Sequence, residues 1–228
     1  MQVDFSKVVD LSQRMIPGKE NFPLEIVPKQ IEEFFPNAKR RLDIQHVLTD
    51  IKVNSHCGTH IEFSLHHWPE GAAAADFPLS RLIAPAVVMD FTHKKIEEFI
   101  TLEDVKQYEG KIQKGDMIFL RTDLDQNYRK ENWADWVQIT EDAARWLMEF
   151  NPCVIGTDAI GFEIRGTDYQ PIHQIISPHA DVAMVESVTN LKEIQDTRAL
   201  VFILAWPVEG LDACPARIIA IKDGGIIP

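Results

Sequence analysis

The sequence of 228 residues contains no run of about 18 consecutive apolar residues, the length that a membrane-spanning helix requires. Cysteine is scarce as well. The three cysteines are odd in number and lack paired spacing, which argues against a disulfide framework and favours a reducing compartment. Asp4 and Lys7 precede any apolar run, so a secretory signal is not indicated. We therefore expect a cytoplasmic protein that does not insert into a membrane.

Positive charge is also in short supply. The chain has 23 Lys and Arg against 35 Asp and Glu, giving a formal net charge of -12. Binding to nucleic acid or to an anionic membrane requires clustered cations. The basic run Lys39, Arg40 and Arg41 is best interpreted as a solvated helix end. The composition therefore argues against nucleic acid and membrane surfaces as partners.

Two catalytic signatures are missing. The chain has no Gly-rich phosphate loop and no G-x-S-x-G nucleophile elbow, so neither nucleotide-dependent chemistry nor a serine hydrolase is supported. The composition, with 45% hydrophobic residues, fits one sizeable domain or a compact pair.

What the chain does have is a dense cluster of histidines. Residues 55–67 hold four of its eight histidines, at positions 56, 60, 66 and 67, together with Glu62. Imidazoles and a carboxylate are ligands that suit zinc, manganese or iron. The first hypothesis is therefore a mononuclear or binuclear metal centre.

The spacing of these residues predicts a bent loop. On a straight strand His56 and His60 would lie roughly 13 Å apart, which is near the limit that two imidazoles span jointly. Gly58 permits a bend between them, and an interior glycine disfavours the helical alternative. If the chain extends again afterwards, its period of two directs Glu62 and His66 to one side. Cys57 would point away as a small buried apolar residue.

Alternating strands and helices predict an α/β architecture. Short β-rich runs predict strands at residues 7–11, 86–91, 117–122, 154–157, 183–188, 201–205 and 217–222. Capping patterns predict helices at 101–108, ended by Gly110, and at 140–150, ended by Asn151 and Pro152.

The histidine-rich segment resembles the signature of the cyclase family of metal-dependent hydrolases, a family that includes arylformamidases and isatin hydrolases. That signature reads H-x-G-T-H-x-D-x-P-x-H. Two positions depart from it: Glu62 stands where Asp is usual, and Ser64 stands where Pro is usual. The longer carboxylate leaves the identity and number of the metal ions open. The matching residues are His56, Gly58, Thr59, His60 and His66.

The resemblance continues along most of the chain. Seven further segments, before and after the histidine-rich signature, are similar to blocks of the family and occur in the same order. They are residues 8–12, 85–90, 156–159, 173–176, 184–191, 207 and 214–221. It implies a single domain over residues 1–228 with the swivelling β/β/α-type fold, in which a mixed β-sheet packs against helices.

The resemblance also implies site residues. The implied metal ligands are His56, His60, Glu62, His173 and Glu186, holding one or two Zn²⁺ or Mn²⁺ ions. Because the second ligand block is one residue longer than usual, His179 is an alternative to His173. The implied catalytic residue is His66, which would transfer protons between the metal-activated water and the leaving nitrogen.

The implied substrate is a small amide, either an N-formyl aromatic amine or a cyclic imide or lactam. The alternative function is a non-catalytic metal-binding or regulatory protein on the same scaffold. We expect His67 to point away from the site.

Other residues give weaker indications. Asp158 ends a predicted strand and is equally well explained as a turn residue or a functional one, whereas Asp123 and Asp125 are better read as surface loop acids. Trp68, Trp133 and Trp136 are candidates for stacking on an aromatic substrate or for a subunit contact.

The segment from Pro17 to Pro36 is rich in Phe, Pro and Ile, more than one core would bury. Together with the resemblance it predicts a homodimer or higher homo-oligomer.

Overall fold

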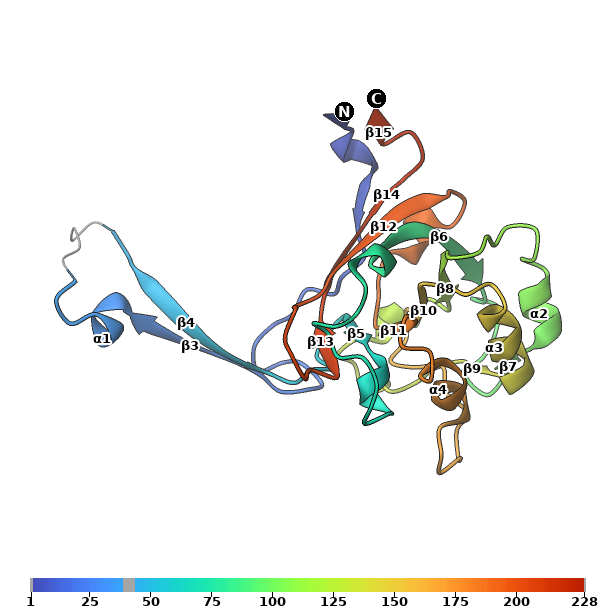
Figure 1. Cartoon of the computed structure of the whole chain (residues 1–228), viewed down its shortest axis with the longest axis horizontal. Helices are drawn as coiled ribbons and strands as arrows, with labels where there is room; N and C mark the ends of the chain where they lie inside the picture. Colours follow the sequence, from blue (N-terminus) through green and yellow to red (C-terminus); the bar gives the residue numbers. More distant parts are fainter. Residues whose placement is uncertain (1, 39–43, 228) are drawn as a thin grey trace.

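One nine-stranded sheet organises the computed structural model, which describes residues 2–38 and 44–227 (Figure 1). The basic run at residues 39–41, which the sequence analysis interprets as a solvated helix end, lies outside the described residues. From edge to edge the strands are β13 (Ala213–Pro215), β5 (His60–Glu62), β11 (Ala183–Glu186), β10 (Val154–Thr157), β8 (Met117–Arg121), β6 (Ile83–Asp90), β12 (Ala199–Leu204), β14 (Arg217–Ile221) and β2 (Val8–Asp10).

The sheet is mixed. Strands β11, β10, β8 and β6 run parallel to their neighbours within this group, and the flanking strands pair antiparallel. Parallel strands are covered on both faces and read as continuous apolar runs. Met117, Ile118, Phe119 and Leu120 of β8 are accordingly fully buried. The predicted α/β class with a mixed sheet is confirmed.

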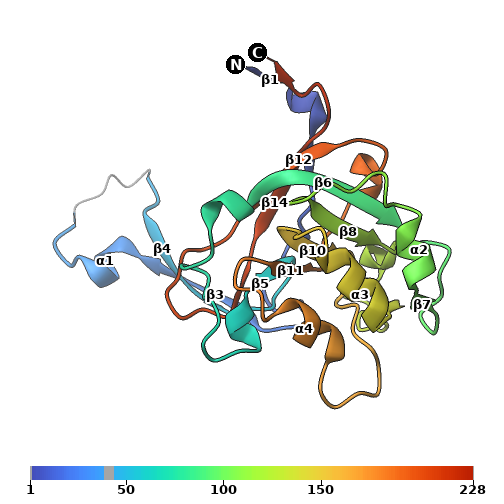
Figure 2. The same ribbon diagram turned by 45° about the vertical axis from the view of Figure 1, so that its right-hand side comes forward.

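Helices cover one face of the parallel strands. Helices α2 (Leu102–Lys106), α3 (Glu141–Met148) and α4 (Pro171–Ile176) pack there, and their apolar side chains join those of β6, β8, β10 and β11 in one core (Figure 2). A second core fills the opposite face, where the curled sheet brings in β5, β12 and β14. Helix α2 begins as predicted: Thr101 N donates to Asp104 Oδ2 at 2.8 Å, and Asp104 N donates back to Thr101 Oγ1 at 3.4 Å.

The predicted strands and helices are all present, with ends shifted by a few residues. The strands and helices that the sequence analysis did not predict are short or lack an alternating apolar and polar pattern. They include β5, β13 and α4. Smaller pairs are β1 (Gln2–Val3) with β15 (Ile226–Ile227) and β7 (Phe99–Ile100) with β9 (Gln138–Ile139). Short 3-10 helices are η1 (Phe5–Lys7), η2 (Ser64–His66), η3 (Leu79–Arg81), η4 (Leu124–Asn127) and η5 (Leu191–Ile194).

A two-stranded arm projects from the body (Figure 1). It consists of β3 (Leu24–Gln30) and β4 (Val47–Val53), with the single turn of α1 (Ile31–Phe34) beyond them. On one face Ile26 lies directly across from Ile51, and these side chains are 47% and 58% exposed. On the other face Glu25 pairs with Lys52 at 3.5 Å. The arm therefore presents an uncovered apolar face.

In the described part of the chain, no helix has the length and apolar character needed to cross a bilayer.

Candidate metal centre

Strand β5 carries the centre of the histidine cluster into the sheet. It pairs with β11 so that Glu62 lies opposite Met184 and His60 lies opposite Glu186. His60 and Glu62 are two residues apart on one strand and therefore share a face. The pairing thus brings the first predicted ligand block beside Glu186, which is more than 120 residues away in the chain.

The loop before β5 turns back as the sequence predicts. Gly58 has φ +72, and a Cβ atom there would lie 2.7 Å from the Met15 sulfur, so only glycine fits without a shift. Thr59 Oγ1 donates to Ser187 O at 2.6 Å and anchors the turn to the end of β11. The ring centroids of His56 and His60 consequently lie 5.1 Å apart.

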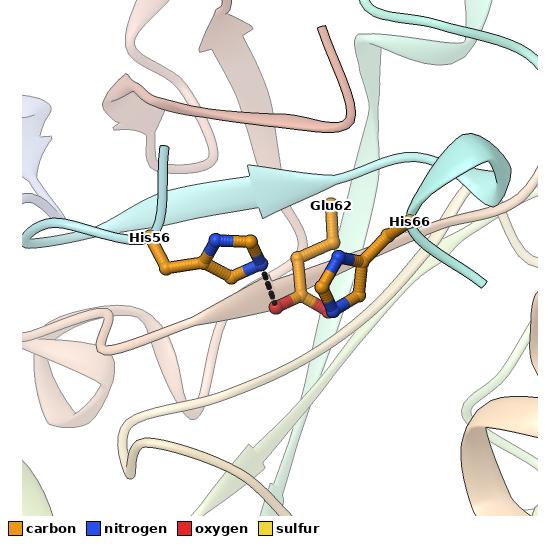
Figure 3. Close-up of side chains that lie close together, drawn as sticks. All are labelled: His56, Glu62 and His66. Atoms are coloured by element: carbon orange, nitrogen blue, oxygen red, sulfur yellow. Dashed lines mark ion pairs between the residues drawn. The ribbon is translucent and has the colours of Figure 1, made fainter. Parts of the chain in front are cut away.

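Glu62 lies between His56 and His66 (Figure 3) and is also close to His60 and His173. Its Oε1 is 3.2 Å from His56 Nε2 and 3.3 Å from His60 Nε2. Its Oε2 is 3.7 Å from Nε2 of His173, a residue of α4. Glu186 Oε2 lies 3.6 Å from His60 Nε2. Both carboxylates are buried, and the five residues that the resemblance implies as ligands therefore form one cluster.

The Nδ1 atoms of these histidines are held from behind. His60 Nδ1 donates to the Gly58 carbonyl at 2.9 Å, and His173 Nδ1 donates to Glu163 Oε2 at 2.8 Å. A nitrogen that donates on one side leaves the other nitrogen with a lone pair, the form in which imidazole binds a metal. The Nε2 atoms of His60 and His173 are thereby directed toward Glu62.

His56 and His66 have similar anchors. His56 Nδ1 lies 3.0 Å from Ser55 Oγ, and His66 Nδ1 donates to Asp212 Oδ2 at 3.0 Å. The ring centroids of His56 and His66 are 4.5 Å apart. His66 belongs to η2, so the chain does not stay extended after Glu62 as the sequence analysis assumed, but the 3-10 turn still directs His66 toward Glu62.

Negative charge dominates the centre. Burial lowers the pKa of His173, but its hydrogen bond with Glu163 and the nearby Glu62 carboxylate outweigh it and raise the pKa to about 10. Burial and the nearby Glu62 raise the pKa of Glu186. Burial raises the pKa of Glu62, but the nearby imidazoles of His173, His56 and His60 outweigh it and lower the pKa. The carboxylates therefore attract positive charge into a buried space.

The residues fit a divalent metal ion. His56 Nε2 and Glu62 Oε2 are buried and have no hydrogen-bond partner, a costly state that a bound cation would relieve. Two groups of donor atoms each lie within 4.8 Å of one another and share Glu62: His56, Glu62 and His66 form one, and His60, Glu62 and Glu186 form the other. The donor set suits one ion, or two ions that share Glu62.

Two expectations about neighbouring histidines have clear outcomes. His179 is exposed in the turn after α4, outside the cluster, so His173 is the histidine of that block that reaches Glu62. The expectation that His67 points away is wrong. Its ring centroid lies 4.6 Å from that of His173 and 4.4 Å from that of His66, because η2 folds the chain back. Burial lowers the pKa of His67 to about 4.

The other candidate residues, Asp158 and three tryptophans, lie at different distances from the cluster. Asp158 is buried and accepts hydrogen bonds from Thr122 N and Asp123 N, so it fastens a loop on the far side of β10 from the cluster. Trp136 lines the cavity beside the cluster, and Trp133 packs edge-on against Phe22 at 5.9 Å, whereas Trp68 is 41% exposed.

Sequence reasoning missed Glu163 and Asp212, the carboxylates that orient His173 and His66. Glu163 also accepts hydrogen bonds from the backbone N–H groups of Ile172 and His173 at the start of α4. Both acids follow apolar or turn residues without a motif of their own. Their role becomes visible only in the structure, where each accepts a hydrogen bond from the Nδ1 atom of a histidine.

A cavity of about 460 Å³ opens onto the cluster. Its lining includes six side chains of the cluster, His56, His60, Glu62, His66, His173 and Glu186. Its walls include the apolar or aromatic residues Phe22, Trp136, Ile160 and Ile164, and the polar residues Arg165, Thr167 and Gln170. This volume and lining are typical of small-molecule sites.

Comparisons with known proteins agree with this geometry. The family model for Cyclase matches residues 9–164. A kynurenine formamidase of Sphingopyxis alaskensis is 27% identical over 165 residues, covering 72% of this chain and 75% of the relative. The solved structure of a potential metal-dependent hydrolase with cyclase activity superposes with a TM-score of 0.75 at 26% identity, covering 97% of this chain and 99% of the other.

A further structural match concerns the fold alone. Isatin hydrolase A from Labrenzia aggregata, bound to benzyl benzoate, superposes with a TM-score of 0.76 at 20% identity, covering 93% of this chain and 92% of the other.

Proposed function

The chain belongs to the cyclase family, and from this premise we propose that it is a metal-dependent hydrolase of a small amide. The observation that carries the proposal is the convergence of His56, His60 and His173 on Glu62. Their Nε2 atoms lie within 3.7 Å of its carboxylate oxygens, and orphaned buried atoms occur at the same point.

We assign the ligands as His56, His60, Glu62, His173 and Glu186. A divalent ion in this site would polarise an amide carbonyl and acidify water. Zn²⁺ and Mn²⁺ are the ions we propose, because both accept mixed imidazole and carboxylate ligands. Glu62, one methylene longer than the aspartate of the family signature, lies within 3.7 Å of all three histidines and would be a ligand of an ion that they hold.

We assign His66 to proton transfer. Asp212 fixes its Nδ1, so its Nε2 faces the cavity side of the cluster near His56. A positioned imidazole takes a proton from the attacking water and returns it to the departing nitrogen, which prevents expulsion of an unstable amide anion.

The substrate classes that we propose are an N-formyl aromatic amine and a cyclic imide or lactam. The apolar walls formed by Phe22, Trp136, Ile160 and Ile164 support a flat ring next to the scissile bond. The kynurenine formamidase relative supports the first class, and the isatin hydrolase fold is compatible with the second.

Three broader assignments complete the proposal. Residues 1–228 form one catalytic domain, supported by the continuous nine-stranded sheet. The enzyme is at least a homodimer, supported by the uncovered apolar face of the arm. It resides in the cytoplasm, supported by three buried cysteines without a disulfide.

The test is to load purified protein with Zn²⁺ or Mn²⁺ and to assay formanilide, N-formylkynurenine and isatin. We expect turnover of at least one substrate and loss of both metal and turnover in the His56→Ala/His60→Ala double variant. His93→Ala, a change at an exposed histidine, is the matched control. Metal retained by the double variant would refute the site. Bound metal without turnover of any amide would favour the alternative, a non-catalytic metal-binding or regulatory protein.

A further inference from the structure

Among the described residues that line the cavity beside the cluster, Arg165 is the one arginine or lysine. Its guanidinium carbon lies 4.5 Å from the centroid of the Trp136 ring, a stacked cation–π arrangement. The Trp136 indole N–H donates to the backbone carbonyl of Glu163 at 2.7 Å. Since the Glu163 carboxylate holds His173, Arg165 belongs to the same rigid wall as the proposed metal site.

Backbone groups hold the guanidinium in place. Its Nη1 donates to Ile96 O at 2.8 Å, and its Nη2 donates to Trp136 O at 2.6 Å. The Arg165 backbone N–H donates to Gln138 Oε1 at 2.8 Å. A guanidinium has five N–H donors, so these contacts fix its position and leave three donors for another partner.

The charge of Arg165 has no counterion. Within the described residues, no carboxylate lies at ion-pair distance from it. Six other arginines of this acidic chain do pair with carboxylates, and they are Arg81, Arg121, Arg129, Arg145, Arg198 and Arg217. A half-buried arginine that lines a cavity and has no carboxylate partner among the described residues is suited to bind an anion.

The lining of the cavity therefore carries both signs of charge. Glu62 and Glu186 belong to the cluster, where a divalent ion would offset their charge, and Glu163 holds His173. Arg165 supplies a fixed positive charge on the wall, and Ile160 and Ile164 provide apolar surface beside it. A ligand that matches this pattern has a reacting amide at one end, a flat apolar middle and an anionic group.

We propose that Arg165 forms an anion subsite that binds a carboxylate of the substrate, which makes the substrate an aromatic amide that carries a carboxylate. The amide part of this inference rests on the proposed function, but the anion subsite does not. A planar guanidinium with spare donors recognises a carboxylate through two parallel hydrogen bonds, whereas the ammonium of lysine acts as a point charge.

The experiment compares matched substrates with matched variants. Formanilide is the neutral substrate, and 2-, 3- and 4-formamidobenzoate add a carboxylate at increasing distances from the amide. The variants are Arg165→Met, which removes the charge, and Arg165→Lys, which keeps it without the planar fork. Arg145→Met is the control, because Arg145 lies exposed on α3, away from the cavity lining, and pairs with Glu141.

In the wild-type protein, we expect at least one formamidobenzoate to exceed formanilide in kcat/KM. Arg165→Met should reduce kcat/KM for that substrate about 10- to 100-fold, mainly through KM, because a charged hydrogen-bond pair is lost. Turnover of formanilide by the same variant should fall by a clearly smaller factor, because formanilide lacks the carboxylate, and this difference separates loss of the subsite from a general collapse of the site. For Arg165→Lys, kcat/KM for the formamidobenzoate should lie between the values of the wild-type protein and of Arg165→Met. An equal loss for both substrates, or no loss for either, would overturn the subsite.

A binding measurement keeps the inference testable if no amide is hydrolysed. 2-Aminobenzoate is fluorescent and carries the carboxylate but no amide, so its dissociation constant is measured on Zn²⁺-loaded protein by titration. We expect Arg165→Met to weaken binding about 10-fold or more, and Arg145→Met to leave it unchanged. Unchanged binding in Arg165→Met would show that the carboxylate binds elsewhere, for example to the metal. Binding that depends on Arg165 without hydrolysis would support the subsite and count against the proposed function.

Discussion

The Nδ1 atom of His66 lies 3.0 Å from Oδ2 of Asp212, a residue 146 positions further along the chain. The sheet creates this pair. Phe63 N donates to Asp212 O at 2.9 Å where β5 and β13 meet, so the two side chains emerge together. Partial burial raises the pKa of Asp212, but the hydrogen bond with His66 outweighs it and lowers the pKa. An ionised Asp212 therefore fixes the orientation of His66.

We predict that His66→Ala keeps its metal but loses catalysis. Removing a general acid–base group slows turnover by about 10²- to 10⁴-fold and leaves the ligand set intact. Metal content by elemental analysis and kcat on the best amide substrate test this prediction together. Asp212→Asn should reduce kcat by roughly 10-fold or more, because the imidazole stays but loses its orientation.

A different result would reassign His66. Its ring nitrogen lies within 4.8 Å of donor atoms of His56 and Glu62, so the geometry also allows ligation. A His66→Ala protein that loses one equivalent of metal would make it a ligand, and normal turnover would remove it from catalysis.

The histidine-rich segment was predictable because its information is local. Gly58 between His56 and His60 defines a bend that no other residue permits, and the structure has that bend with φ +72. Cys57 was predicted as a buried apolar residue, and its exposed fraction is 0%. Such features follow from residue types at fixed spacing.

The carboxylates behind the histidines were not predictable, because their role depends on tertiary structure. Glu163 orients His173 only after α4 has packed beside Trp136. Asp212 orients His66 only after β13 has paired with β5. Strand β5 itself was missed because it has only three residues, of which His60 and Glu62 are functional and Ile61 alone is apolar. The strands of the arm were not predicted from the sequence. The expectation that the segment from Pro17 to Pro36 has more apolar surface than one core buries agrees with the exposure of Ile26, which lies across from the exposed Ile51.

Removal of the metal should destabilise the fold. Without a cation, the buried carboxylates of Glu62 and Glu186 face each other across His60. An ion that binds only the native state adds roughly 4 kcal/mol at a concentration 1,000-fold above its dissociation constant. We therefore expect a chelator to lower the thermal midpoint of the wild-type protein measurably, as followed by calorimetry.

The control for metal removal is the double variant His56→Ala/His60→Ala. Its midpoint should not respond to the chelator, since it lacks the site. A wild-type midpoint that is insensitive to both chelator and added Zn²⁺ would argue against a structural contribution from the cluster.

The arm should mediate self-association. Isolated two-stranded ribbons are marginally stable in water, and Ile26 and Ile51 form an exposed cross-strand pair on one face. We predict a dimer mass for the wild-type protein by light scattering at micromolar concentration. Ile51→Asp should weaken the dimer by about 10-fold or more, because it places a charge in the apolar contact.

Glu25→Gln is the matched control for the arm, since Glu25 lies on the opposite, ion-paired face. It should leave the dimer unchanged. A monomeric wild-type protein, or equal effects of the two substitutions, would show that the apolar face of the arm is not the contact.

Asp158 gives the chain a pH-dependent stability that is separate from the metal centre. Burial raises the pKa of its carboxyl group from 3.8 to about 7, even though Thr122 and Asp123 donate hydrogen bonds that favour the ionised form. In the unfolded chain the group titrates near its ordinary value. Between these two pKa values the native state binds more protons than the unfolded state, so the contribution of Asp158 to stability falls as pH rises.

Comparison with Asp158→Asn isolates this contribution, because the amide cannot ionise. Raising the pH from 5 to 7 should cost the metal-loaded wild-type protein roughly 2 kcal/mol of unfolding free energy relative to the variant. Urea denaturation of both proteins at each pH measures that difference. Stability of the wild-type protein that instead rises relative to Asp158→Asn over this interval would mean that the hydrogen bonds from Thr122 and Asp123 outweigh burial and keep Asp158 ionised in the native state.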